Sequence, residues 1–168
     1  MKKRTGAWTA TIFVIGAAFI GVPADDATAA RFEKLKGLAG DWTKSGGDGS
    51  VEASYRVTAG GTAVMETLFP GTPHEMVTVF TVDKGDLVLT HYCAAGNQPR
   101  MKADRGGDAS SIAFKFDGGG NIKSTKDGHM HEASFAFKDA DHLTSTWQFY
   151  TDGKPGEKKE FDLIRKKS

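Results

Sequence analysis

The sequence lacks the features that would point directly to a chemistry. It has a single cysteine, Cys93, so no intramolecular disulfide can form. No G-x-S-x-G motif is present, and this motif carries the nucleophile of many serine hydrolases. The glycines at 118–120 do not join a strand to a helix, as a phosphate-binding loop would. The sequence therefore indicates a fold more directly than it indicates a reaction.

An excess of charge of either sign is also missing. Lys and Arg number 22 and Asp and Glu number 21 in 168 residues. Residues 1–29 hold three of the basic and two of the acidic side chains, and without them both counts are 19. A chain without net positive charge lacks the basic surface that binds nucleic acids. We therefore expect no nucleic-acid partner.

The first 29 residues predict a secretory signal peptide. A basic start at Lys2–Arg4 precedes an apolar run over Ala7–Val22, and Ala27–Ala29 provides an A-x-A exit. The run is shorter than the roughly 20 residues that a retained membrane anchor needs. We expect residues 30–168 to form one mature domain that is periplasmic or secreted, with no membrane attachment after signal cleavage.

The mature chain has few long apolar runs and many glycines, 21 in the whole sequence, which favours short strands joined by tight turns. Helical spacing occurs over Arg31–Leu38, where an apolar residue recurs at every third position. Alternation and turn residues predict ten strands after Gly40. They are expected at Asp41–Ser45, Val51–Thr58, Thr62–Phe69, Glu75–Val82, Asp86–Cys93, Arg100–Asp104, Ser111–Phe116, Met130–Phe137, His142–Tyr150 and Lys158–Arg165.

These strands predict an all-β fold, an antiparallel up-and-down barrel of about ten strands with a short N-terminal helix. Ile112, Phe114 and Phe116 alternate with solvent-compatible residues, and His142–Tyr150 alternates in the same way. Turns such as Asp117–Gly120 are expected between the strands. An apolar inner face allows two outcomes, a filled barrel or one that holds a small ligand.

Gly40 and Trp42 form a G-x-W sequence that resembles the signature opening the first strand of lipocalins and related calycin barrels. The resemblance implies that a basic residue of the last strand, here Arg165, packs on the Trp42 indole. An uncharacterised secreted bacterial family of lipocalin-like barrels is similar over nearly the whole mature chain, and it implies a fold without an assigned reaction. The length also resembles that of haem-binding nitrobindin-type barrels, whose haem-ligating histidine has no match at a specific position here. The runs similar to the secreted family include Ser54–Thr58, Pro70–Thr72, His74–Val77 and His91–Met101.

The clearest local signal is the stretch His74–Met101. Asp83–Gly85 supplies a hairpin turn, and the period of two then places His91 and Cys93 on one face with two leucines. We interpret the polar segment Ala94–Pro99 as a rim loop over a pocket. The prediction is a barrel that binds a small, partly apolar molecule in its mouth. The expected ligand-binding residues are His74, His91, Cys93, Asn97, Arg100, Met101, His129 and His131.

Two other interpretations stay open. An enzyme would use His91 with Glu66 for proton transfer, or a histidine cluster with a metal or haem. His129 and His131 have the spacing of metal ligands but need a third ligand, and strand counting sets them about 14 Å from His91 around the rim. A structural or interaction module would instead have a filled lumen. The filling side chains would be Phe114, Phe116, Phe135, Phe137 and Trp147.

The sequence alone assigns no role to two titratable side chains, Cys93 and Glu66. Cys93 needs a positioned imidazolium to become a nucleophile, and a buried inert thiol is the simpler interpretation. Glu66 shares a face with Val64 and Leu68, but the opposite face is equally apolar, so the sequence does not decide where the carboxyl points. Inside the barrel it would need a partner such as Arg56, Arg100 or a histidine. We assign no catalytic residue, metal ligand or cofactor.

Overall fold

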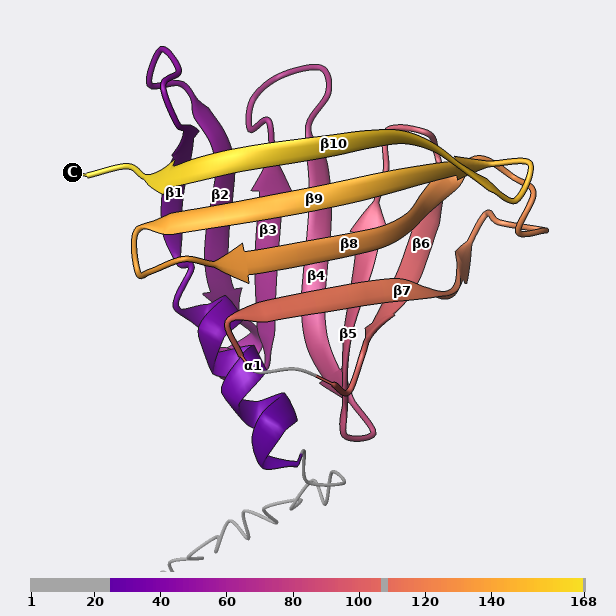
Figure 1. Ribbon diagram of the computed structural model, residues 1–168, viewed down its shortest axis with the longest axis horizontal. Helices are drawn as coiled ribbons and strands as arrows, with labels where there is room; N and C mark the ends of the chain where they lie inside the picture. The colour runs from indigo at the N-terminus through magenta and orange to yellow at the C-terminus, as the bar shows by residue number, and fades with distance from the viewer. Residues whose placement is uncertain (1–24, 107–108, 168) are drawn as a thin grey trace, which may run out of the picture.

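The strands of this chain close into a ten-stranded antiparallel barrel, as the alternation predicts. The structure is a computed structural model that describes residues 25–106 and 109–167. Each strand pairs with its neighbours in sequence, and β1 pairs with β10 to complete the ring (Figure 1). The elements are α1 (Asp26–Lys36), β1 (Gly40–Lys44), β2 (Val51–Thr58), the short 3-10 turn η1 (Ala59–Gly61), β3 (Ala63–Leu68), β4 (Met76–Asp83), β5 (Asp86–Tyr92), β6 (Gln98–Ala103), β7 (Ser111–Gly120), β8 (His129–Phe137), β9 (His142–Thr151) and β10 (Lys154–Arg165).

A two-residue turn sets the register of the hairpin formed by β4 and β5. Lys84 and Gly85 have φ angles of 51° and 86°. Two consecutive residues with positive φ form the turn whose twist matches that of paired antiparallel strands. The resulting register places Thr78 opposite His91. A short local signal thus decides which side chains meet inside the barrel.

The glycines at the end of β7 belong to the barrel wall, so the turn predicted over Asp117–Gly120 is wrong. β7 runs to Gly120, which pairs with Gln98 of β6. Gly119 has a φ of 148°, and a Cβ atom there would lie 2.3 Å from the carbonyl oxygen of Gln98. The two backbones approach this closely because residue 119 has no side chain.

Helix α1 covers one end of the barrel (Figure 1). The carboxylate of Asp25 accepts a hydrogen bond from the backbone N–H of Thr28 at 2.7 Å, which caps the first turn. Phe32 and Leu35 are buried on the inner face of the helix, and Leu38 is buried just after it. The helix therefore closes the barrel as a plug.

The helix begins earlier than the range Arg31–Leu38 that the spacing predicts. Arg31, in the second turn of α1, donates from its guanidinium to the carbonyl oxygens of Asp104 and Gly106. Asp26 to Ala29 thus form a turn of α1, although the sequence assigns them to the signal peptide. The rest of that predicted peptide, residues 1–24, lies outside the described residues.

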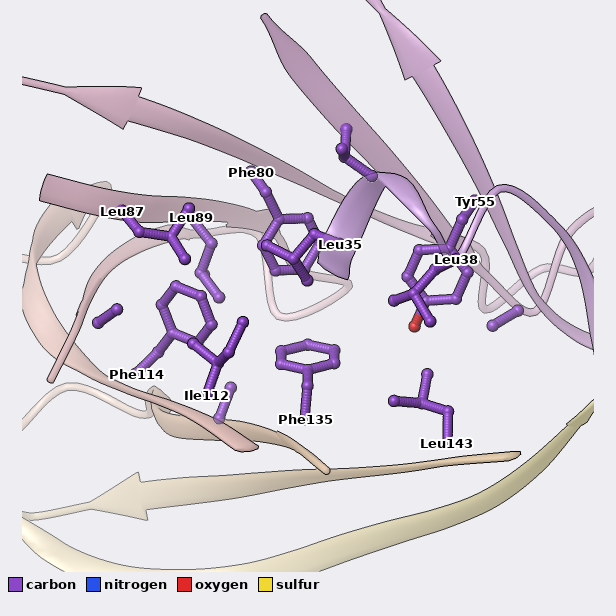
Figure 2. Close-up of a cluster of buried hydrophobic side chains, with 14 of the residues drawn as sticks. Leu35, Leu38, Tyr55, Phe80, Leu87, Leu89, Ile112, Phe114, Phe135 and Leu143 are labelled. Carbon is purple, nitrogen blue, oxygen red and sulfur yellow. The ribbon is translucent and has the colours of Figure 1, made fainter. Parts of the chain in front are cut away.

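The half of the barrel next to α1 is filled by aromatic and aliphatic side chains. The rings of Phe80, Phe114 and Phe135 have centroids 5.3 to 5.9 Å apart and meet at tilted or edge-to-face angles. Leu35 and Leu38 belong to the same cluster and reach it from the helix side (Figure 2). This half has the interior of an ordinary protein core.

Trp42 and Arg165 form the contact that the lipocalin resemblance implies. They are register partners in β1 and β10, and the guanidinium carbon lies 4.5 Å from the centre of the indole. The indole N–H donates to the carbonyl oxygen of Leu38 at 2.7 Å. Arg165 also donates to the carbonyl oxygens of Gly37 and Ala39 and to the turn between β8 and β9. The arginine therefore ties the end of α1 to the wall as well as covering the indole.

Candidate functional site

A cavity of about 350 Å³ lies in the half of the barrel away from α1. This volume is near the lower end of the roughly 300–1,000 Å³ range of small-molecule pockets. Its lining comes from the ends of strands distant in sequence, so it exists only in the folded barrel. Apolar side chains form most of the wall, namely Leu68, Phe69, Met76, Met130, Trp147, Phe149 and Phe161, and the polar lining residues are Glu52, His91, Glu157 and Lys159.

The cavity borders a gap in the barrel wall. β1 pairs with β10 only through Trp42–Lys44, opposite Leu163–Arg165. In the described part of the chain, the half of β10 before Asp162 therefore has β9 as its single strand neighbour. Glu157 and Lys159 line the cavity from this half and are exposed. The entrance is consequently lateral, between β10 and β2, rather than under the loop that follows β5.

Two phenylalanines stand at this gap. Phe69 follows β3 and Phe161 lies on β10, and their rings meet edge to face with centroids 5.7 Å apart. Phe69 has a φ of 52°, in the left-handed region that bulky residues avoid. Backbone strain of this kind is concentrated at ligand clamps and active sites. The aromatic pair therefore forms part of both the entrance and the cavity wall.

A row of four polar side chains runs along the inner wall from β2 to β5 and ends at the cavity. The strand registers place Tyr55, Glu66, Thr78 and His91 opposite one another on β2 to β5. All four are buried. The Tyr55 hydroxyl donates to Oε1 of Glu66 at 2.6 Å, and Oγ1 of Thr78 lies 3.0 Å from Nδ1 of His91. In this row Thr78 is the register partner of both Glu66 and the cavity-lining His91.

Burial shifts both ends of this row towards their neutral forms. Desolvation raises the pKa of Glu66 to about 7, against the opposing effect of hydrogen bonds from Tyr55 and Thr78. Desolvation lowers the pKa of His91 to about 4. The pKa of Tyr55 is raised well above its usual value by burial and by the nearby Glu66 charge, so its hydroxyl keeps its proton.

Thr78 couples the ionisation of Glu66 to the tautomer of His91. Its hydroxyl stabilises the Glu66 carboxylate, although Oε2 has no hydrogen-bond partner among the described residues. An ionised Glu66 draws the single hydroxyl proton of Thr78, so Nδ1 of His91 must carry a hydrogen and Nε2 becomes an acceptor. A protonated Glu66 frees that hydroxyl to donate to Nδ1, and Nε2 then carries the hydrogen.

Two residues of the cavity lining carry a buried polar atom without a partner in the described part of the chain. These atoms are Nε2 of His91 and Nε1 of Trp147. The two rings lie close together, with centroids 4.7 Å apart. An unpaired buried polar group costs about 1–3 kcal/mol. These two atoms are therefore the polar groups of the cavity lining that lack a partner within the described residues.

Among the eight predicted ligand-binding residues, His91 is the one that lines this cavity. Met101 is fully buried in the core. Arg100 lies on the outer face, where its guanidinium contacts Asp83 and Asp117 at 2.7 Å each. Burial alternates along β6, so Arg100 and Met101 face opposite sides and neither reaches the cavity.

The predicted loop residues hold the turn after β5. His74 is exposed in the segment between β3 and β4. The backbone N–H of Cys93 donates to the carbonyl oxygen of Asn97 at 3.0 Å, and the thiol is free and half-buried. The Asn97 side chain is buried and donates to the carbonyl oxygen of Gly128 at 2.7 Å. The segment Ala94–Pro99 therefore ties β5 to the approach of β8 and does not line the cavity.

His129 and His131 form a separate cluster, since Met130 between them lines the cavity and they do not. Nδ1 of His129 donates to the carbonyl oxygen of Asp127 at 2.7 Å, and its Nε2 lies 2.9 Å from Nδ1 of His131. The described residues contain no group of three or more His, Cys, Asp or Glu side chains that could hold a metal ion. The histidine pair thus has no third ligand from the described part of the chain.

The partners of Glu66 are what sequence reasoning missed. The candidates were Arg56, Arg100 and the histidines, whereas the structure provides Tyr55. The signal was present, because the tight turn η1 sets the register that pairs Tyr55 with Glu66. Trp147, which would fill the lumen of a structural module, packs in the core and also forms part of the cavity wall.

Known protein families offer no match to this chain. No family model matches it, and no curated protein is significantly similar. Within residues 25–106 and 109–167, none of the helices has the length and apolar character to cross a membrane.

Proposed function

We propose that the protein is an exported barrel that binds a small, partly apolar molecule. The observation that carries this proposal is the cavity of about 350 Å³, with apolar walls and the incomplete polar pair His91 and Trp147. Empty space in a core costs stability, and the half next to α1 shows that the same strands can be filled completely. A cavity retained in the other half supports a role in binding.

The lining suggests how such a molecule would be held. Its apolar body would lie among the aromatic and methionine side chains, with its polar end at His91 and Trp147. The entrance carries charges of both signs, with Lys159 paired to Glu157 at 2.6 Å. A mixed rim does not attract one charge strongly, which favours a ligand that is neutral overall.

Export and membership of a lipocalin-like family are parts of the same proposal. Trp42 covered by Arg165 at the closed end supports the family resemblance, and the N-terminal apolar run supports export. Lipocalin-like barrels typically combine one closed end with a ligand cavity, and this arrangement fits the one described.

Mass spectrometry of what co-purifies with the native protein tests the proposal. We expect a small molecule to accompany the unaltered protein and the His74→Ala variant, whose side chain is exposed and is not part of the cavity lining. Leu68→Trp should fill the cavity and exclude the molecule. If nothing co-purifies and apolar probes do not raise the melting temperature of the unaltered protein, the binding proposal is wrong.

An enzymatic role is the second candidate, and the row from Tyr55 to His91 is the observation that favours it. His91 would accept a proton from the bound molecule through Nε2, and Glu66 would act through Thr78. Prolonged incubation of the protein with its co-purified molecule, followed by mass spectrometry, separates the two roles. Conversion that is lost in Glu66→Gln would favour the enzyme, and an unchanged molecule would favour binding alone.

A further inference from the structure

The incomplete polar pair specifies the functional group of the bound molecule. We infer that this molecule carries a hydroxyl group, seated between Nε2 of His91 and Nε1 of Trp147. The inference rests on the proposed function, because it names the chemical class of the molecule that the cavity takes.

The positions of the two side chains favour a shared partner. Both line the cavity, and each is only 1% exposed. Nδ1 of His91 is already engaged by Thr78, so the atom left for a ligand is Nε2. The imidazole and indole rings are tilted by 40° with centroids 4.7 Å apart. Because the two rings are neighbours, one polar group of a bound molecule is the simplest partner for both atoms.

The chemistry of the two atoms selects the group. The Trp147 indole N–H donates only, so the ligand must offer an acceptor. Nε2 of His91 is an acceptor when Nδ1 carries the hydrogen, so the ligand must also offer a donor. A hydroxyl meets both needs with one oxygen, whereas an ether or a ketone meets only the first.

A carboxylate ligand fits less well. It can only accept, and burying its charge among apolar side chains next to a neutral imidazole is costly. Glu52 and Glu157 also line the cavity and would repel it. A neutral alcohol or phenol avoids both costs, and the aromatic walls favour a phenol.

Glu66 and Thr78 act on this site as positioning residues. When Glu66 is ionised, Thr78 directs His91 to present Nε2 as an acceptor, which suits the ligand hydroxyl. When Glu66 is protonated, Nε2 and Nε1 both donate, and the hydrogen of the ligand hydroxyl loses its partner. The preference for a hydroxyl should therefore strengthen as pH rises through neutrality.

Three matched probes test the inference: 2-naphthol, 2-methoxynaphthalene and naphthalene, titrated calorimetrically at pH 6 and pH 8. At pH 8 we expect 2-naphthol to bind at least about tenfold more tightly than either analogue, the effect of one good hydrogen bond. The ratio of the affinity for 2-naphthol to the affinity for either analogue should be smaller at pH 6. The exposed-site variant His74→Ala should keep both the ratio and its pH dependence.

Substitutions of Trp147 and Thr78 assign the effect to this polar site. Trp147→Phe keeps a ring and removes the N–H, so the ratio of 2-naphthol to naphthalene affinity should fall towards one. Thr78→Val should abolish the pH dependence of the ratio, and Thr78→Ser should restore it. If Trp147→Phe does not fold, as judged by its melting curve, the two Thr78 variants decide.

The outcomes separate this inference from the proposed function. Equal affinity for all three probes would overturn the hydroxyl while leaving the apolar cavity as a binding site. Binding of 2-methoxynaphthalene as tight as that of 2-naphthol would mean that the ligand is only an acceptor. Failure of every probe to bind would overturn the proposed function, and the inference with it.

Discussion

Trp42 and Trp147 lie in different halves of the same barrel and differ in one respect. Both are almost fully buried. The N–H of Trp42 donates to Leu38, and Arg165 covers its ring. The N–H of Trp147 has no partner in the described residues, and its ring lines the cavity. One half is filled by its own side chains, and the other holds the cavity in which we propose that a small molecule binds.

The difference follows from how far helix α1 reaches. A barrel of eight strands is just wide enough for its side chains to fill, so ten strands enclose more space than the wall residues occupy. At the closed end Leu35 and Leu38 supply the missing volume. No helix enters the other half in the described part of the chain, and the space remains as the cavity. The filled core and the proposed binding site thus have separate locations.

The largest expected effect is on stability at the closed end. Trp42→Ala should lower the free energy of unfolding by about 3–5 kcal/mol, because it empties a packed site. Arg165→Ala should cost about 2–4 kcal/mol, since it removes charge-assisted hydrogen bonds to the end of α1 as well as the indole contact. Denaturant unfolding measures both. Trp147→Ala should cost less than Trp42→Ala, because its space joins an existing cavity, and an equal cost would mean that the two halves are packed alike.

The buried row predicts two opposing dependences of stability on pH. Between about pH 4.5 and 7 the folded protein keeps the Glu66 proton that the unfolded chain has lost, so this contribution falls as pH rises. Between about pH 4 and 6.5 the unfolded chain binds a proton at His91 that the folded protein does not, so this contribution rises with pH. The two largely cancel in the unaltered protein.

Single substitutions should expose each contribution. As pH rises from about 4 to about 7, Glu66→Gln should gain stability relative to the unaltered protein, and His91→Gln should lose stability. Each change should be on the order of 3 kcal/mol. Unfolding curves collected from pH 4 to 8 provide the measurement. Parallel profiles for all three proteins would show that neither group has a shifted pKa.

A smaller effect separates the two indole N–H groups. Trp42→Phe should cost about 1–3 kcal/mol beyond its lost volume, because the carbonyl oxygen of Leu38 loses its donor. Trp147→Phe should be close to neutral in the ligand-free protein, since the removed N–H has no partner in the described residues. Equal penalties would indicate that the Trp147 N–H is satisfied by an ordered water.

The smallest effect concerns the start of α1. Asp25→Ala should lower the free energy of unfolding by about 1 kcal/mol, the usual value of an N-cap. If the protein is exported, cleavage before Asp25 keeps this cap, whereas cleavage after Ala29 removes it together with the buried Thr28. The mass of the mature chain distinguishes the two. We expect the longer product, because the helix plug is then whole.

Much of the fold was readable from local patterns. The ten strands lie close to the predicted ranges, and the barrel closes as their alternation indicates. The contact between Trp42 and Arg165 was also predicted, although its hydrogen bonds to the end of α1 were not. Even the wrong turn at Asp117–Gly120 has a local cause, because glycine serves both a turn and a close approach of two strands.

The candidate site was predicted only in part. The alternation of side chains along β5, which puts His91 on the same face as two leucines, was enough to predict that His91 points into the barrel. The same alternation could not place Glu66, because both faces of β3 are about equally apolar. Arg100 was assigned to the mouth with the loop before it, and His129 and His131 were assigned to it by counting strands around the rim. The structure places Met130, between the two histidines, in the cavity lining, because adjacent residues of a strand face opposite sides.

Local patterns specified the secondary-structure elements of this protein. Turn residues and alternation act over a few positions, and they set the strands, the hairpin registers and the closure of the barrel. The position of the cavity was decided by the tertiary structure alone. It depends on how far α1 enters the barrel and on how much longer β10 is than β1. Both are relations between segments distant in sequence, so no local pattern encodes the space between them.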